Sequence, residues 1–145
     1  MWSTTHTAET AAAPTQVWAA LVALHSGTPL GPNSDSFELH GPFEAGTTLT
    51  VTPHGQEPMT STITELIPGA VYADQTVFGE LTLTFRHRLT PAPTGGTSVS
   101  HTLEITGSGA DVVGPELGPQ ISGDFPEAMT ELLRAAESWP SGVEA

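Results

Sequence analysis

The chain has 145 residues, and its formal net charge of −13 reflects 16 Asp and Glu residues against three Arg and no Lys. A surface this acidic repels phosphate backbones and anionic membranes, so neither nucleic acid nor a membrane is an expected partner. The absence of Cys excludes disulfides, thiolate metal sites and cysteine nucleophiles. No stretch reaches about 18 apolar residues and no signal-peptide pattern is visible, which leads us to expect one soluble, cytoplasmic domain over residues 1–145.

The first half of the chain predicts a strand, a helix and four short strands. Residues 2–10 are polar and rich in Thr, as in a strand with one exposed face. Proline suits the first turn of a helix, so Pro14 is the expected start of a helix with an apolar stripe. That stripe consists of Val17, Trp18, Leu21, Val22 and Leu24, and Gly and Pro residues end the helix after residue 26. Strands are then predicted at residues 35–40, 47–53, 59–67 and 70–78.

Residues 80–107 predict a long hairpin with a histidine on the apolar face of each arm. One arm carries Leu81, Leu83, Phe85, His87 and Leu89, and the other carries Val99, His101, Leu103 and Ile105. Strict alternation of these residues with polar ones is typical of half-buried strands. If residues 92–96 form the loop, His87 lies directly opposite His101.

The hydrophobic period changes after residue 109. Helical spacing relates Ile121, Phe125, Met129, Leu132, Leu133 and Ala136. We therefore expect a regular helix at about residues 126–138, preceded by an irregular segment that contains Pro115 and Pro119. The predicted fold class is α+β, with an antiparallel sheet of about seven strands wrapped around the long C-terminal helix and a short helix after the first strand.

Three short motifs accompany this order of elements. They are residues 13–18 (APTQVW), 41–47 (GPFEAGT) and 63–69 (ITELIPG). With them and the hairpin, the chain resembles the START-related, polyketide cyclase-like (SRPBCC) superfamily over essentially its whole length. The resemblance implies a helix-grip fold with a deep cavity between the sheet and the C-terminal helix. The superfamily includes cyclases, dehydratases, hydrolases, carriers and chaperone activators, so the resemblance does not assign a reaction.

His87 and His101 are the candidate catalytic residues. An imidazole serves general acid–base catalysis or ligand binding, because small environmental changes move its pKa across neutral pH. The alternative is a pair of interior histidines whose polar atoms are satisfied within the protein. A metal site would need a third ligand, and no neighbour in the sequence offers one, so neither a metal nor another cofactor is predicted.

The predicted ligand-binding residues come mostly from the inner faces of the hairpin and the last helix. They are Tyr72, Asp74, Leu83, Phe85, Leu89, Val99, Leu103, Met129, Leu132 and Leu133. Tyr72 and Asp74 alternate on one strand, and they either point into the cavity or belong to the polar face. The remaining histidines, which are His6, His25, His40 and His54, have no constellation around them in the sequence.

The functional hypothesis is a protein that binds a small hydrophobic or aromatic molecule in an internal cavity. Nucleotide-binding loops, the nucleophile elbow of serine hydrolases and the His-Glu-x-x-His zinc motif are all absent from the sequence. Polyketide cyclase or dehydratase chemistry is the leading hypothesis. The alternatives are a non-catalytic carrier of lipids or small molecules and a chaperone-activator-like interaction protein, and the sequence leaves open whether the chain forms a homodimer.

Overall fold

The computed structural model describes residues 1–32, 34–93 and 95–140. Its elements are β1 (Trp2–Thr10), α1 (Pro14–His25), β2 (Ser36–Leu39), β3 (Thr48–Thr52), β4 (Met59–Ile67), β5 (Val71–Phe78), β6 (Leu81–Pro91), β7 (Thr97–Gly107), α2 (Ala110–Ser122) and α3 (Phe125–Glu137). The strands form one antiparallel sheet of seven strands in the order β1-β7-β6-β5-β4-β3-β2. The predicted helix-grip architecture is thereby confirmed.

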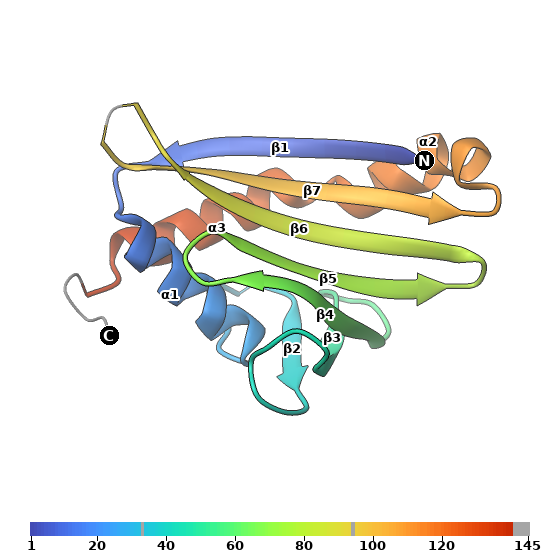
Figure 1. Ribbon diagram of the computed structural model, residues 1–145, viewed down its shortest axis with the longest axis horizontal. Helices are drawn as coiled ribbons and strands as arrows, with labels where there is room; N and C mark the ends of the chain where they lie inside the picture. Colours follow the sequence, from blue (N-terminus) through green and yellow to red (C-terminus); the bar gives the residue numbers. More distant parts are fainter. Residues whose placement is uncertain (33, 94, 141–145) are drawn as a thin grey trace.

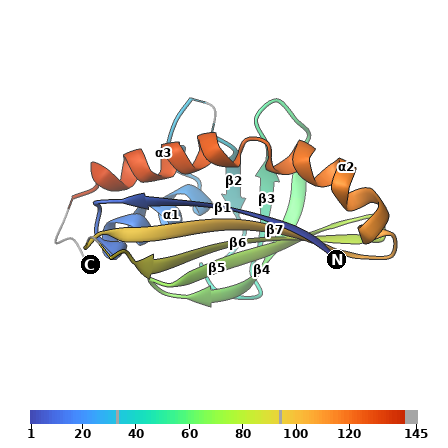
Figure 2. The same ribbon diagram turned by 90° about the horizontal axis from the view of Figure 1, so that it is seen from above.

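The helices cover one face of this strongly curved sheet (Figures 1 and 2). Figure 2 shows α2 and α3 following one another along that face, with α1 below the C-terminal part of α3. The face is apolar because alternate residues of each strand point toward the helices, as the period-2 pattern predicts. In β7 these are Thr97, Val99, His101, Leu103 and Ile105, all of them buried.

The register of the β6–β7 hairpin agrees with the sequence prediction. Phe85 pairs with Leu103 and His87 pairs with His101, and residues 92–96 connect the two strands. The row continues across the sheet, because Tyr72 of β5 pairs with His87 and His6 of β1 pairs with His101. Side chains directly opposite one another on neighbouring strands lie on the same face, so the register places these residues together.

The prediction of an irregular segment before the last helix is wrong. Residues 110–122 form a regular helix, α2, although Pro115 and Pro119 lie inside it. Each proline removes one backbone hydrogen bond, which ordinarily weakens a helix. Packing against β1 compensates: an added Cβ at Gly114 or Gly118 would clash with the Trp2 side chain, so these glycines allow close contact with the indole.

Two clusters of buried apolar residues make up the core. The larger one joins α1, the sheet and α3, and it includes Val17, Leu21, Leu89, Val99, Met129 and Leu133. The smaller one lies where α2 and the start of α3 cover β6 and β7, and it includes Leu83, Leu103, Ile105 and Phe125. Among the described residues, no helix is long and apolar enough to cross a bilayer.

Candidate functional site

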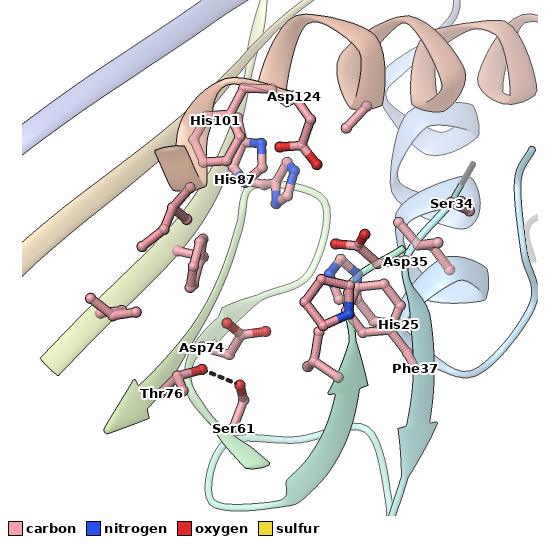
Figure 3. Close-up of a pocket in the computed structure, with 18 of the residues that line it drawn as sticks. His25, Ser34, Asp35, Phe37, Ser61, Asp74, Thr76, His87, His101 and Asp124 are labelled. Carbon is pink, nitrogen blue, oxygen red and sulfur yellow. Dashed lines mark hydrogen bonds between the residues drawn. The ribbon is translucent and has the colours of Figure 1, made fainter. Parts of the chain in front are cut away.

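A cavity of about 400 Å³ lies between the two core clusters. It is enclosed by the inner faces of β4 to β7, the end of α1, the segment before β2 and the α2–α3 junction, as Figure 3 shows from within. Its apolar lining includes Leu21, Leu24, Phe37, Val51, Met59, Leu83, Phe85, Leu117, Ile121, Phe125 and Leu132. Its polar lining includes His25, Ser61, Tyr72, Asp74, Thr76, His87 and His101. A cavity of this size and character is typical of a site for a small molecule.

The two predicted histidines stack on each other inside the cavity. Their ring centroids are 4.0 Å apart, and Phe125 stacks on the other side of His101 at 3.7 Å. The Nδ1 atom of His87 is fully buried and has no hydrogen-bond partner among the described residues. A buried polar atom without a partner is costly, so it indicates a place where a ligand or water would bind.

His25, the last residue of α1, is a third imidazole of the same site. Its ring lies 4.1 Å from that of Tyr72 and 5.9 Å from that of His87. Its Nδ1 atom lies 2.8 Å from the Leu21 carbonyl oxygen, which can only accept, so Nδ1 donates and Nε2 of the neutral ring carries the lone pair. The sequence analysis missed this residue, although its position four residues after Leu21 on the apolar face of the helix was a usable signal.

Polar side chains of β5 form another part of the wall. The Tyr72 hydroxyl donates a hydrogen bond of 2.7 Å to Asp74, and both residues are buried. Farther along the same face, Thr76 and Ser61 of the neighbouring strand β4 are hydrogen-bonded (Figure 3). Of the two orientations left open by the sequence, the structure therefore has Tyr72 and Asp74 lining the cavity.

Burial changes the proton affinities of these groups in opposite directions. Desolvation lowers the pKa of His25 to about 4 and that of His101 to about 3. Burial, reinforced by repulsion from His101 and His25, also holds the pKa of His87 well below its usual range. Burial raises the pKa of Asp74 to about 6, against the opposing effect of the Tyr72 hydrogen bond. At neutral pH the three imidazoles are thus uncharged, while Asp74 exchanges protons near pH 6.

Comparison with known proteins agrees with this arrangement of sheet, helix and cavity. Residues 1–137 match the family model described as "Polyketide cyclase / dehydrase and lipid transport". The chain belongs to this family. It is thereby also a member of the SRPBCC superfamily, as its sequence motifs predict. None of the curated protein sequences compared with this chain matches it.

Solved structures similar to this cyclase/dehydrase family member show the same fold at low sequence identity. Norcoclaurine synthase from Thalictrum flavum, solved with dopamine and hydroxybenzaldehyde, aligns with a TM-score of 0.75, 15% identity and coverage of 97% of this chain and 88% of that chain. Ara h 8.0201 aligns with a TM-score of 0.73, 16% identity and coverage of 94% and 98%. Protein MLL2253 from Mesorhizobium loti aligns with a TM-score of 0.66, 12% identity and coverage of 94% and 97%.

Half of the predicted ligand-binding residues of this family member line the cavity. The cavity is lined by Tyr72, Asp74, Leu83, Phe85 and Leu132, together with both predicted catalytic histidines. Leu89, Val99, Leu103, Met129 and Leu133 belong to the two core clusters and do not line the cavity. Strand alternation places a residue on the inner face of the sheet, but a helix packed directly above it fills the space that a ligand would need. No cluster of His, Asp or Glu with metal-binding geometry is present among the described residues.

Proposed function

We propose that this protein binds a small ketone-bearing molecule with a flat apolar body and catalyses its enolisation, as a polyketide cyclase or dehydratase-like enzyme. The observation that carries the proposal is Asp74, a buried carboxyl group with a pKa of about 6, placed in one cavity with three uncharged imidazoles. A general acid–base catalyst works best when its pKa lies near the working pH. The family description supports cyclase or dehydratase chemistry, and the stacked aromatic rings suit a flat ligand.

The proposed reaction begins with proton transfer. The Asp74 carboxylate takes a proton from the carbon next to a ketone, and the electron pair moves to the ketone oxygen. A neutral imidazole N–H of His87 or His101 donates a hydrogen bond to that oxygen, since the low pKa of each ring leaves it uncharged at neutral pH.

A second carbonyl of the same molecule then completes the ring. The enolate carbon attacks that carbonyl carbon, one carbon–carbon bond forms, and the resulting alkoxide takes the proton from Asp74. Loss of water from this alcohol gives the dehydrated ring. Positioning of the two carbonyls within the cavity supplies much of the expected acceleration, because the ring closure is intramolecular once the bound ligand adopts the right conformation.

The proposal can be tested with 2-tetralone, a small bicyclic aryl ketone. The protein should accelerate exchange of the α-protons in D₂O, followed by NMR, and the rate should rise with pH around 6 as Asp74 ionises. Asp74→Asn should lower the catalysed rate about 10²–10⁴-fold, the usual contribution of a general base. Glu38→Gln removes an exposed carboxyl group of β2 outside the cavity and should change nothing.

Two results would contradict the proposal in different ways. If 2-tetralone binds but exchanges no faster than in buffer, the cavity belongs to a carrier that does no chemistry. If neither 2-tetralone nor other small aromatic ketones perturb the resonances of His25 and His101, the cavity is not a binding site.

A further inference from the structure

The charge of the cavity wall and mouth has one sign only. Five carboxyl groups line it, which are those of Asp35, Asp74, Asp124, Glu127 and Glu131. The chain has no Lys, and none of its three Arg residues is in the cavity lining of the described residues, although His54 interacts with Asp35. Arg86 of β6 points to the outer face of the sheet, where it pairs with Glu65 and Glu104.

Asp35 and Asp124, from distant parts of the sequence, both line the cavity at its solvent-exposed mouth, where Asp35 is partly exposed and Asp124 is exposed. Asp35 lies just before β2, and Asp124 lies at the α2–α3 junction. Figure 3 shows both carboxyl groups turned toward the cavity. Glu131 closes the same side, since an added Cβ at Gly31 would lie 2.5 Å from its Oε2 atom. Burial raises the pKa of Asp35, and the charges of Asp124 and Glu131 add to that effect, while the backbone N–H and the side chain of His54 oppose it.

A second, independent feature inside the cavity also calls for a hydrogen-bond donor. The Nδ1 atom of His87, which lines the cavity, is buried and has no hydrogen-bond partner among the described residues. A neutral imidazole offers one lone pair, which an N–H group of a ligand can satisfy. Buried Asp74 also adds negative charge to the same space whenever it is ionised. The cavity therefore combines acceptors and negative charge with aromatic faces, the environment that stabilises an organic cation.

We propose that the ligand carries a protonated amine, held at the cavity mouth between Asp35 and Asp124, with its apolar body inside. This inference rests on the proposed function, because it names the class of ligand that the same cavity takes. A cation relieves the repulsion between the mouth carboxylates, whereas an anion adds to it. Carboxylate-bearing and phosphate-bearing molecules of the same size are therefore poor ligands.

Three probes of similar shape but different charge show how the charge of the ligand affects its affinity. They are 2-(2-naphthyl)ethylamine, the neutral 2-(2-naphthyl)ethanol and the anionic 2-naphthylacetate, each titrated by calorimetry at low ionic strength. We expect the amine to bind at least about tenfold more tightly than the alcohol, and the carboxylate to bind more weakly than either. Added salt should shrink the advantage of the amine, since the mouth is open to solvent.

Two double variants with equal changes in net charge locate the effect. Asp35→Asn with Asp124→Asn should bring the amine and the alcohol to within about threefold of each other. Both changes preserve shape, and the amide oxygen introduced at position 35 can still accept the hydrogen bond that Asp35 receives from the His54 backbone. Glu38→Gln with Glu116→Gln removes two exposed carboxyl groups outside the lining and should leave the tenfold preference intact.

The outcomes distinguish this inference from the proposed function. Equal binding of the alcohol and the amine to the parent protein would overturn the amine inference and leave the cavity as a binding site. A preference for the amine that survives in the Asp35→Asn, Asp124→Asn variant would overturn the role of the mouth. Failure of all three probes to bind or to shift the His25 and His101 resonances would remove the proposed function itself, and the inference with it.

Discussion

The region beneath α1 and the second half of α3 is closely packed, whereas the region beneath the α2–α3 junction is hollow. Both regions use the inner face of the same strands, and Leu89 and His87 are only two residues apart on β6. Leu89 is 5% exposed and belongs to the large apolar core, while His87 lies in the cavity. Buried polar groups in the cavity destabilise the fold, but they are available to a ligand. The closely packed region beside the cavity provides the stability that offsets this cost.

The largest expected effect comes from the packed region. Leu89→Ala should lower the free energy of unfolding by about 2–5 kcal/mol, because it leaves a void among closely packed side chains. Urea denaturation measures the change, and binding of 2-tetralone to the folded variant should stay as in the parent. A loss well below this range would mean that the two regions do not differ in packing as described.

In the hollow region, Asp74→Asn should stabilise the protein at neutral pH. Burial raises the folded-state pKa of Asp74 from 3.8 to about 6, so protonated Asp74 favours folding at acid pH and this contribution disappears as the pH rises through 6. At pH 7 the variant should gain up to roughly 3 kcal/mol over the parent, with the gap closing near pH 4. Equal stability of the two proteins across this pH range would contradict the raised pKa.

His101→Leu should weaken the sensitivity of the fold to acid. The folded-state pKa of His101 is about 3, so between pH 6.5 and 3 the unfolded chain binds a proton that the folded chain does not. As the pH falls from 7 to 5, this group therefore lowers the free energy of unfolding of the parent by roughly 2 kcal/mol. The variant should not show this decrease. Denaturation curves at the two pH values test this, and Glu104→Gln on the outer face of β7 provides a control that retains all three buried imidazoles.

The smallest effect is expected on the outer face of the same hairpin. Arg86 lies 3.1 Å from Glu65 and 3.4 Å from Glu104, but all three side chains are partly exposed, so water screens the pairs. Arg86→Met should therefore change the free energy of unfolding by less than about 1 kcal/mol. The affinity for 2-tetralone should not change. A marked loss of binding would mean that a substitution on the outer face of the sheet alters the cavity.

The sequence was sufficient to predict the sheet, the hairpin register and the last helix, because these depend on strictly periodic apolar residues. The orientation of Tyr72 and Asp74 could not be read in the same way, since β5 is buried on both faces from Val71 to Asp74 and shows no apolar–polar alternation there. In the neighbouring strand β4, a β-bulge between Ile63 and Glu65 interrupts the alternation. Glu65 consequently lies on the outer face with Arg86, and the pattern recovers at Leu66.

Other features of the fold and the site could not be predicted from the sequence, because they depend on tertiary packing. Local rules disfavour a helix through Pro115 and Pro119, whereas the packing of α2 against Trp2 and the smaller core cluster favours it. His25 joins the site because α1 ends against β5 and β6, and Asp35 and Asp124 meet there across 89 residues of sequence. No pattern in the sequence relates two single acidic residues in separate loops.

The pairing of β1 with β7 has a consequence for how quickly the chain can fold. Trp2 lies opposite Ile105, so among the described residues the first strand finds its only strand partner after all the other strands have been made. The β6–β7 hairpin, by contrast, closes over a short loop and can form as soon as its residues are available. Closing such a long loop is slow, so β1 should add late, and the contact between Trp2 and α2 must wait for it.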